Sequence, residues 1–459
     1  MNQQDAIRTA LAYAPSWLEL QQRYMPFVGA QVAVRLDGEL LLNHAVGRAD
    51  IANNVPMTTD HLFRIASHSK TFTGVAIMQL VEQGKLRLDD EAGVHVPELA
   101  GCDMARVTVR EMLSHGSGMT RDGDNSDFWG LARPFPDRDE LIATIREHGK
   151  VIEPNKHFKY SNIAFSLLGL MIEAVSGQAY RDYVTANIVN RLGLENTGPD
   201  YTSSREADFA KGYSARVHGD QRVEIEHIDT FAESSATGFY STAADVTAYF
   251  EAHLDGDERL ITDASKRRMR QVQWLVEDDQ AYGLGLIRTT VNGREYWGHS
   301  GGYPGHITMS RFDPERRLVI SVLTNAIDGP ALTLATAILR LIDRALDEKA
   351  TAKEHDSDVL EKFEGRFTTL WGVTDIANLG GRLYAMVPTQ DNPAAKAIGL
   401  EVVSDTGLEV VDDPGFGGCG ETMRYTFGPD GSVEWIRGAS GQTMVPLDRF
   451  ALPPKVTRP

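Results

Sequence analysis

Apolar residues form two runs that are hydrophobic nearly all round a helix. The first covers residues 72–81 and is followed by Gly84, and the second covers residues 163–175 and is followed by Ser176-Gly177. A helix without a polar face is buried, and glycine often ends a helix because it accepts a left-handed backbone. Both runs are therefore predicted to be core helices.

The two ends of this apolar middle show other periods. Residues 6–24 have the pattern of an amphipathic helix, and so do residues 331–346, which Pro330 opens at a favoured position. A hairpin is predicted over residues 29–47, with Asp37-Gly38 as its tight turn. After Tyr282 the period becomes two, which predicts strands at residues 283–288, 295–297, 306–312 and 318–323.

These elements predict an α/β fold of the α+β kind. Early and late strands bracket a helical middle, so we expect one antiparallel sheet flanked by helices, with a helical subdomain inserted. Residues 347–360 are charged and poor in apolar side chains, which indicates a linker. Short strands and turns follow, so residues 361–459 are predicted to form a small β-barrel or sandwich. The expected division is a domain at 1–346, the linker, and a domain at 361–459.

Composition narrows the possible partners. The chain has 459 residues and a net charge of −18, from 46 basic and 64 acidic residues, which argues against nucleic acid or an anionic membrane as partner. No apolar run approaches the eighteen residues of a membrane span, and the N-terminus lacks the pattern of a signal peptide. We expect a cytoplasmic protein with at most one disulfide, since only Cys102 and Cys419 are present. Free thiols are the expectation.

The first candidate chemistry lies at the entry to the first core helix. Ser67 and Lys70 are three residues apart, so they share one face of a helix and the lysine amine can reach the serine hydroxyl. A lysine at the entry to a core loses solvation, its pKa falls, and it can accept a proton. Backbone N–H groups of the first turn face an incoming anion. A lone Ser-x-x-Lys is common by chance. The position of this one at the entry to a buried helix is what makes it a candidate catalytic pair.

Two further segments carry candidate groups. Tyr160 and Asn162 stand at the N-terminal end of the second core helix. Residues 298–302 (Gly-His-Ser-Gly-Gly) allow two interpretations. Either Ser300 is a nucleophile in a Gly-x-Ser-x-Gly elbow, which requires a helix directly after it, or His299 and its glycines lie on a strand beside the reacting serine. In the second interpretation an N–H near Gly302 faces the oxyanion, opposite the N–H of Ser67.

Taken together in this order, the three segments resemble the serine β-lactamase and penicillin-binding-protein superfamily. The resemblance is to its class C-like branch, which includes D-aminopeptidases, D-Ala-D-Ala carboxypeptidases and related esterases. The motifs are Ser67-x-x-Lys70, Tyr160-Ser161-Asn162 and His299-Ser300-Gly301, and His in the third resembles D-aminopeptidases and esterases more than class C β-lactamases, which have Lys there. One departure is Pro154-Asn155 where the family often has Pro-Gly, and Asn tolerates the positive φ such a turn needs. Supporting matches occur at residues 63–70, 108–118, 167–177, 238–245 and 282–285.

The resemblance implies a β-lactamase/transpeptidase-like fold with a lipocalin-like C-terminal barrel. It implies Ser67 as the acylated nucleophile, Lys70 as its base, and Tyr160 as the base or proton relay of deacylation. Asn162, His299 and Gly301 would bind substrate, and the N–H groups of Ser67 and Gly302 would form the oxyanion hole. Which of Lys70 and Tyr160 rests deprotonated stays open, because the two titrations are coupled. His68 and His115 are expected to be structural.

The predicted function is hydrolysis of amide or peptide bonds through an acyl-enzyme, with D-amino-acid-containing substrates favoured, as in a D-aminopeptidase or a D-Ala-D-Ala carboxypeptidase. A carboxylesterase of the same fold is the main alternative. A β-lactamase, or a penicillin-binding sensor that acylates without turnover, ranks below both. No metal or other cofactor is expected, since no metal-ligand spacing occurs in the sequence. The sequence leaves the oligomeric state open, and a homo-oligomer is compatible with it.

Overall fold

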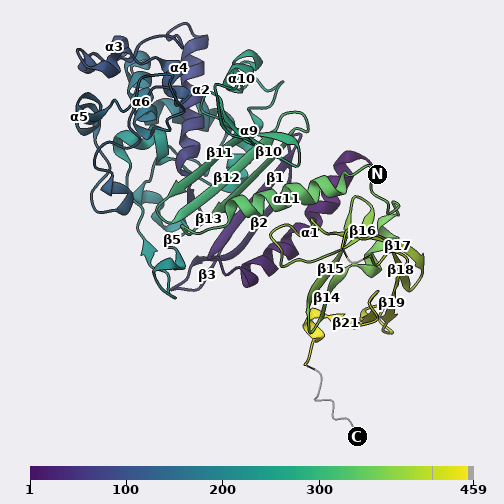
Figure 1. Ribbon diagram of the computed structural model, residues 1–459. Coiled ribbons are helices and arrows are strands. Elements are labelled where there is room, and N and C mark those ends of the chain that lie inside the picture. Colours follow the sequence, from purple (N-terminus) through teal and green to yellow (C-terminus); the bar gives the residue numbers. More distant parts are fainter. Residues whose placement is uncertain (416, 453–459) are drawn as a thin grey trace. The chain divides into compact units, whose positions relative to one another are not determined.

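A computed structural model describes residues 1–415 and 417–452 and divides into two compact units (Figure 1). The sheet unit comprises Phe27–Ala335, and the barrel unit comprises Met1–Pro26 and the chain from Thr336 onward. The N-terminal helix α1 (Gln3–Tyr24) thus belongs to the same compact unit as the C-terminal strands. The domain boundaries expected from the sequence remain a prediction, and residues 453–459 of the second domain lie outside the described residues.

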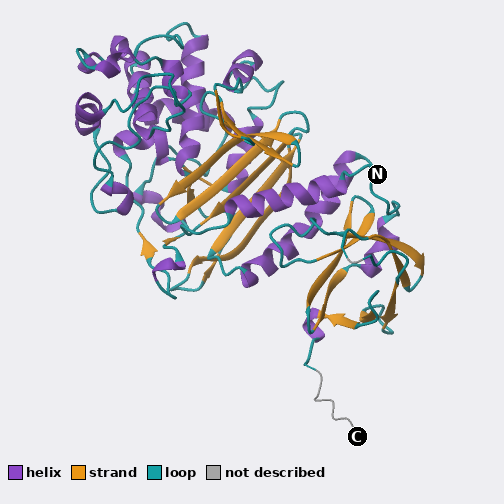
Figure 2. Cartoon of the chain, viewed as in Figure 1, coloured by secondary structure: helices purple, strands orange, loops and turns teal. Residues whose placement is uncertain are grey.

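A nine-stranded antiparallel sheet forms the centre of the sheet unit (Figure 2). The strand order is β3-β2-β1-β13-β12-β11-β10-β9-β8, so strands from the start and the end of the unit pair directly, β1 with β13. The expected antiparallel sheet is therefore confirmed. Its strands are β1 (Gly29–Leu36), β2 (Glu39–Asp50), β3 (Val55–Pro56), β8 (Trp274–Glu277), β9 (Gln280–Tyr282), β10 (Ile287–Val291), β11 (Arg294–Tyr303), β12 (His306–Asp313) and β13 (Leu318–Thr324).

Local turn chemistry explains the β1–β2 hairpin. Asp37 and Gly38 have φ of 46° and 90°, the pair of positive angles that a tight hairpin turn requires. The structure departs from the expected strands at β11, which continues through the glycines to Tyr303. Pairing with β12, from Trp297 with Phe312 to Tyr303 with His306, keeps that glycine-rich stretch extended. Strands β8 and β9 were not predicted.

The two apolar runs form the core helices α2 (Ser69–Glu82) and α6 (Asn162–Ser176), which pack against each other. Gly177 ends α6 with φ of 71°, as expected for its position. The other helices of this unit are α3 (Ala92–His95), α4 (Val109–Leu113), α5 (Arg138–His148), α7 (Tyr180–Val184), α8 (Asn190–Leu192), α9 (Ala243–Glu251) and α10 (Asp263–Met269). Helix α11 (Ala331–Ala345) carries the chain out of this unit.

A closed barrel of eight strands forms the barrel unit, confirming the predicted C-terminal β-barrel. Its interior is filled by apolar side chains, among them Phe363, Phe367, Leu400 and Ile436. A short helix, α12 (Ser357–Leu360), precedes it. The strands are β14 (Gly365–Thr369), β15 (Gly372–Leu379), β16 (Arg382–Met386), β17 (Ile398–Ser404), β18 (Gly407–Asp412), β19 (Thr422–Phe427), β20 (Val433–Arg437) and β21 (Thr443–Pro446).

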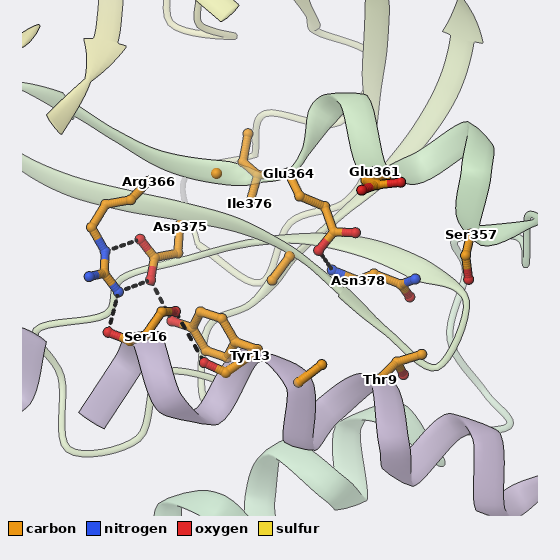
Figure 3. A pocket seen from close by; sticks show the side chains of 13 residues that line it. Thr9, Tyr13, Ser16, Ser357, Glu361, Glu364, Arg366, Asp375, Ile376 and Asn378 are labelled. Atoms are coloured by element: carbon orange, nitrogen blue, oxygen red, sulfur yellow. Dashed lines mark hydrogen bonds and ion pairs between the residues drawn. The ribbon is translucent and has the colours of Figure 1, made fainter. Parts of the chain in front are cut away.

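Polar contacts join helix α1 to the barrel, and Figure 3 shows those of Tyr13 and Ser16 with Asp375 and Arg366. Tyr13 donates a hydrogen bond to Asp375 at 2.7 Å, and the guanidinium of Arg366 holds the same carboxylate through two contacts of 2.8 Å. The Trp17 ring N–H donates to the Pro388 carbonyl at 3.1 Å. Tyr13, Arg366 and Asp375 are among the residues that line a hollow of about 580 Å³, and their polar groups bond to one another.

Other expectations concern membranes and thiols. Within the described residues, no single helix has the length and apolar character to cross a membrane; only α6 with the segment Tyr180–Leu192 passes that test jointly, as a pair bent by 79°. Both cysteines are free, as expected, with Cys102 half-buried and Cys419 exposed.

Candidate active site

The segment Ile65–Ser69, here called the nucleophile turn, presents Ser67 in front of α2. It is entered from the short strand β4 (Phe63–Arg64), which pairs with β7 (Tyr240–Ser241), and it contains a 3-10 turn over Ala66–His68. Ala66 has φ of +48°, a left-handed conformation that non-glycine residues adopt at a cost. Ser67 is therefore held on a strained turn just before the helix, rather than within its first full turn.

Lys70 occupies the first turn of α2, is fully buried, and meets three oxygen atoms. Its Nζ lies 3.0 Å from Ser67 Oγ, 2.7 Å from Asn162 Oδ1 and 2.8 Å from the carbonyl of Ala236. The amide oxygen and the carbonyl can only accept hydrogen bonds, so they take two N–H groups. The remaining direction points to Ser67, where a neutral amine presents its lone pair to the serine hydroxyl.

Burial is the main influence on the charge of Lys70. Loss of solvation lowers the pKa of Lys70 to about 7, while the negative charges of Asp122 and Glu233 act in the opposite direction and Arg121 adds to the lowering. At neutral pH a large share of Lys70 is thus the free amine. This agrees with the expectation for a lysine at the entry to a core.

Tyr160 completes the contacts of Ser67. Its hydroxyl donates to Ser67 Oγ at 2.8 Å, and its ring lies against the buried ring of His115, with centroids 4.2 Å apart. Burial raises the pKa of Tyr160 above its ordinary value, so the phenol keeps its proton at neutral pH. The charge pattern therefore favours Lys70 over Tyr160 as the resting base, the point that the sequence left open.

Asn162 links Lys70 to an acidic loop that the sequence did not single out. Its Nδ2 donates to Asp122 Oδ1 at 2.6 Å, and the Trp129 ring N–H reaches the same oxygen at 3.1 Å. Arg121 lies beside the other oxygen at 3.2 Å. Asp122 thus orients the side chain that binds Lys70. Only its place in an Asp-rich loop marked it in the sequence, and many solvated loops share that composition.

Glu233 is a second residue that sequence reasoning missed. Its side chain is fully buried, and neither carboxyl oxygen has a hydrogen-bond partner within the described part of the chain. Burial raises the pKa of Glu233 to about 8, reinforced by Asp122 and opposed by Lys70. Glu233 is therefore largely protonated at neutral pH, and it adds a negative charge near Lys70 only as the pH rises through about 8. The polar, irregular sequence around it gave no sign of burial.

Strand β11 places the third motif against the nucleophile turn. Gly301 is packed so closely that a Cβ added there would lie 2.3 Å from the Ile65 carbonyl oxygen, whereas one at Gly302 would meet nothing nearer than 3.6 Å. His299 is buried, with Nδ1 at 2.6 Å from the Ser300 carbonyl and Nε2 at 3.2 Å from the Tyr282 hydroxyl. Both of its ring nitrogens are therefore engaged within the protein.

The geometry excludes Ser300 as the nucleophile of an elbow. Ser300 lies in the middle of β11, pairs with Met309 of β12, and is followed by strand rather than helix. Side chains alternate along a strand, so Ser300 faces away from the side on which Gly301 meets Ile65. The face of the sheet that carries the Ser300 side chain lines a separate pocket of about 530 Å³.

Two remaining predictions concern the neighbouring turn and metals. Asn155 has φ of +60°, so it replaces the family's glycine in the left-handed conformation, as expected. His115 is buried and accepts a hydrogen bond from the Ser161 backbone N–H at 3.1 Å, a structural contact. In the part of the chain that the structure describes, no group of three or more His, Cys, Asp or Glu side chains could hold a metal ion.

Known proteins are similar to this chain over the part that holds the three motifs. Residues 19–343 match the family described as Beta-lactamase. The protein flp of Staphylococcus aureus (strain N315) is 28% identical over 311 residues, covering 67% of this chain and 61% of flp. A penicillin-binding protein of Bacillus subtilis (strain 168) is 26% identical over 302 residues, covering 62% of this chain and 65% of that protein. The chain thus matches less than two thirds of the length of these curated relatives.

Solved structures share the fold. The octameric penicillin-binding protein homologue from Pyrococcus abyssi has a TM-score of 0.63 at 22% identity and covers 93% of this chain and 97% of its own. The D-amino acid amidase from Ochrobactrum anthropi SV3, complexed with L-phenylalanine amide, has a TM-score of 0.59 at 25% identity, covering 75% and 98%. EstCE1, described as a hydrolase with promiscuous acyltransferase activity, has a TM-score of 0.62 at 22% identity, covering 72% and 99%.

Proposed function

This chain belongs to the beta-lactamase family, and on that premise we propose that it is a serine hydrolase that forms an acyl-enzyme on Ser67. The observation that carries the proposal is the contact of one hydroxyl with two proton-transfer groups. Ser67 Oγ lies 3.0 Å from Lys70 Nζ and 2.8 Å from the Tyr160 hydroxyl. A serine nucleophile requires a base within such reach.

Acylation begins at Lys70. The neutral amine takes the proton of Ser67 as Oγ attacks the substrate carbonyl, and the lysinium formed is stabilised by Asn162 Oδ1 and the Ala236 carbonyl, which already accept from Nζ. The backbone N–H groups of Ser67 and Gly302 are the proposed oxyanion donors. Tyr160, protonated and hydrogen-bonded to Ser67 Oγ, hands its proton to the leaving amine and recovers one from Lys70.

Deacylation reverses these proton movements. Tyr160, relaying to Lys70, takes a proton from the attacking water, and Ser67 leaves with a proton returned through the same pair. Asn162 and Gly301 are proposed to contact the substrate directly. His299 is proposed to shape the substrate side of β11 as a neutral ring, because both nitrogens are held by Tyr282 and Ser300.

The proposed substrates are amides or peptides, with D-amino-acid residues favoured. The family membership and the D-amino acid amidase of similar fold support this substrate class. A carboxylesterase is the second candidate, and the state of His299 favours it. Burial lowers the pKa of His299 well below its ordinary value, so the third motif supplies a neutral ring where a β-lactamase has a cation to hold a substrate carboxylate.

The test is a matched rate comparison on D-alanine anilide, L-alanine anilide and a short-chain nitrophenyl ester, with the rate of Ser67→Ala subtracted. Turnover of the D-anilide well above the L-anilide would support the peptidase assignment, and turnover of the ester alone would make the protein an esterase. Full activity in Ser67→Ala would refute the proposal altogether. A benzylpenicillin adduct that persists for hours by mass spectrometry would instead indicate a sensor that does not turn over.

Two further properties of this protein, its cellular location and its oligomeric state, remain predictions. A cytoplasmic location stays a prediction, to be tested by cell fractionation with antibody detection. Self-association also stays a prediction, supported by the description of the Pyrococcus abyssi homologue as octameric. Light scattering coupled to size-exclusion chromatography measures the assembly directly.

A further inference from the structure

The residue after the nucleophile, His68, takes part in a buried chain of hydrogen bonds. Its side chain is fully buried, Nδ1 lies 2.9 Å from the Ile65 carbonyl, and Nε2 lies 2.9 Å from Ser310 Oγ on β12. Ser310 Oγ in turn lies 2.9 Å from Ser321 Oγ on β13. One imidazole thus joins the nucleophile turn to two strands of the central sheet.

The partners determine the direction of this chain. A carbonyl oxygen only accepts, so Nδ1 carries the hydrogen and donates it to Ile65. Burial lowers the pKa of His68 to about 4, which keeps the ring neutral and leaves Nε2 as an acceptor for the Ser310 hydroxyl. Ser321 then donates to Ser310. The Thr308 hydroxyl also lies 3.3 Å from Nδ1, farther away than the Ile65 carbonyl. Because the nearest partner of Nδ1 accepts and the partner of Nε2 donates, the hydrogen bonds favour this one orientation of the ring.

The Ile65 carbonyl is the point at which the turn meets β11. It receives the His68 ring N–H, lies 3.5 Å from the Thr308 hydroxyl, and stands where a side chain at position 301 would be. The strained Ala66 separates it from Ser67. A shift of this carbonyl therefore moves Ser67 relative to the strand that carries Gly302.

We propose that His68 is a positioning residue that fixes the separation between the nucleophile turn and β11 through its hydrogen bond to the Ile65 carbonyl. The ring does not touch the substrate. It sets the spacing of the two backbone N–H groups, at Ser67 and Gly302, between which the substrate carbonyl is proposed to sit. The inference rests on the proposed role of Ser67 as nucleophile.

Two isosteric variants separate positioning from general packing. Asn at position 68 retains a donor where Nδ1 stands and loses the contact with Ser310, whereas Gln retains the contact with Ser310 and loses the donor to Ile65. The first readout is the second-order rate constant for labelling of Ser67 by a fluorophosphonate, measured by mass spectrometry of the adduct. The second is hydrogen exchange of the peptide that covers the nucleophile turn, which needs no activity.

We expect His68→Asn to be labelled within about threefold of the wild-type rate. His68→Gln should be labelled about ten- to a hundredfold more slowly, since a displacement of about 1 Å has effects of that size. Exchange in the turn should rise in His68→Gln only. A purely structural ring predicts equal damage in both variants, and that result, or wild-type labelling in both, would overturn the proposal.

Two further outcomes keep the result decisive. If neither variant folds, Ser310→Ala removes the donor to Nε2 but leaves the ring and its bond to the Ile65 carbonyl, so labelling should stay within about threefold of the wild-type rate; a loss of about tenfold or more would count against the Ile65 bond as the contact that sets the spacing. If the wild-type protein is not labelled at Ser67, the proposed function has failed, and the exchange of the turn in the two variants still decides the role of His68.

Discussion

The contact between Gly301 and the nucleophile turn gives the sharpest prediction. In Gly301→Ala the new Cβ would lie 2.3 Å from the Ile65 carbonyl oxygen and 2.4 Å from Thr308 Oγ1. The first is a backbone atom, held in place by the His68 ring, so it cannot rotate away. Strand β11 and the turn must move apart by about 1 Å to restore an ordinary van der Waals contact.

That movement should lower both the free energy of unfolding and the rate at which Ser67 reacts. Forcing an extra methyl group into a close-packed site costs about 1–3 kcal/mol of unfolding free energy. A displacement of about 1 Å between a nucleophile and its oxyanion donors slows the reaction by about a hundredfold. Glycine has no side chain, so Gly301→Ala removes no proton-transfer group. The loss of rate should therefore appear as a slower reaction of Ser67.

Gly302→Ala is the matched control, one residue along the same strand. Its Cβ would meet only Ile307 Cδ1, at 3.6 Å, an ordinary contact, and alanine keeps the backbone N–H. Fluorophosphonate labelling of Ser67 and urea unfolding are measured for both variants. We expect Gly302→Ala within about threefold of the wild-type rate. Equal rates in the two variants, or an unchanged Gly301→Ala, would refute the steric reasoning.

Three further predictions follow from charge and burial. Because Lys70 reacts as the free amine, kcat/KM should rise with pH through about 7, and Asp122→Asn should move that rise to lower pH by removing a charge that raises the pKa of Lys70; pH–rate profiles measure both. Asp200→Ala should lower the free energy of unfolding in urea by about 3–5 kcal/mol. The reason is that the Asp200 carboxylate lies 2.9 Å from the fully buried Arg64 guanidinium, which would lose its charged partner. Tyr13→Phe removes a buried hydrogen bond to a carboxylate within the barrel unit and should cost about 1.5–3 kcal/mol in the same assay.

Each of these predictions has a control in the chain. Burial raises the pKa of Glu233 to about 8 and keeps it largely protonated near neutral pH, so Glu233→Gln should move the pH profile less than Asp122→Asn does. An equal or larger shift in Glu233→Gln would contradict the charge reasoning. Asp208→Ala breaks an exposed pair with Arg205 and should cost less than about 1 kcal/mol. Tyr24 is 60% exposed, so Tyr24→Phe should be nearly neutral. An Asp200 or Tyr13 variant as mild as its control would show that the buried contact contributes little.

Periodicity and turn chemistry were sufficient for much of the fold. The runs that are apolar all round became α2 and α6, and the positive φ of Gly38 and Asn155 followed from residue type alone. These features are local, because side-chain shape and backbone preference act within a few residues. The pairing of Ser67 with Lys70 is local too, since three residues on a helical path bring them together.

The residues around that pair depend on contacts that no local pattern contains. The contact of Tyr160 with Ser67 joins groups 93 residues apart, and the link between His68 and Ser310 spans 242 residues. Asp122 and Glu233 resemble ordinary loop acids in the sequence, and only folding buries Glu233 near Lys70. Burial changes a pKa by removing water, and water is removed by the whole fold, so tertiary structure alone decides the charge of these groups.

The sequence by itself determined which side chains this protein has for chemistry, their order along the chain, and the helices and turns on which they stand. Tertiary structure decided which of them meet, how the neutral ring of His299 is held, and that α1 packs with the C-terminal barrel through Tyr13. The physical reason is range. Backbone preference acts over a few residues, whereas packing, desolvation and hydrogen bonding between distant segments exist only once the chain has folded.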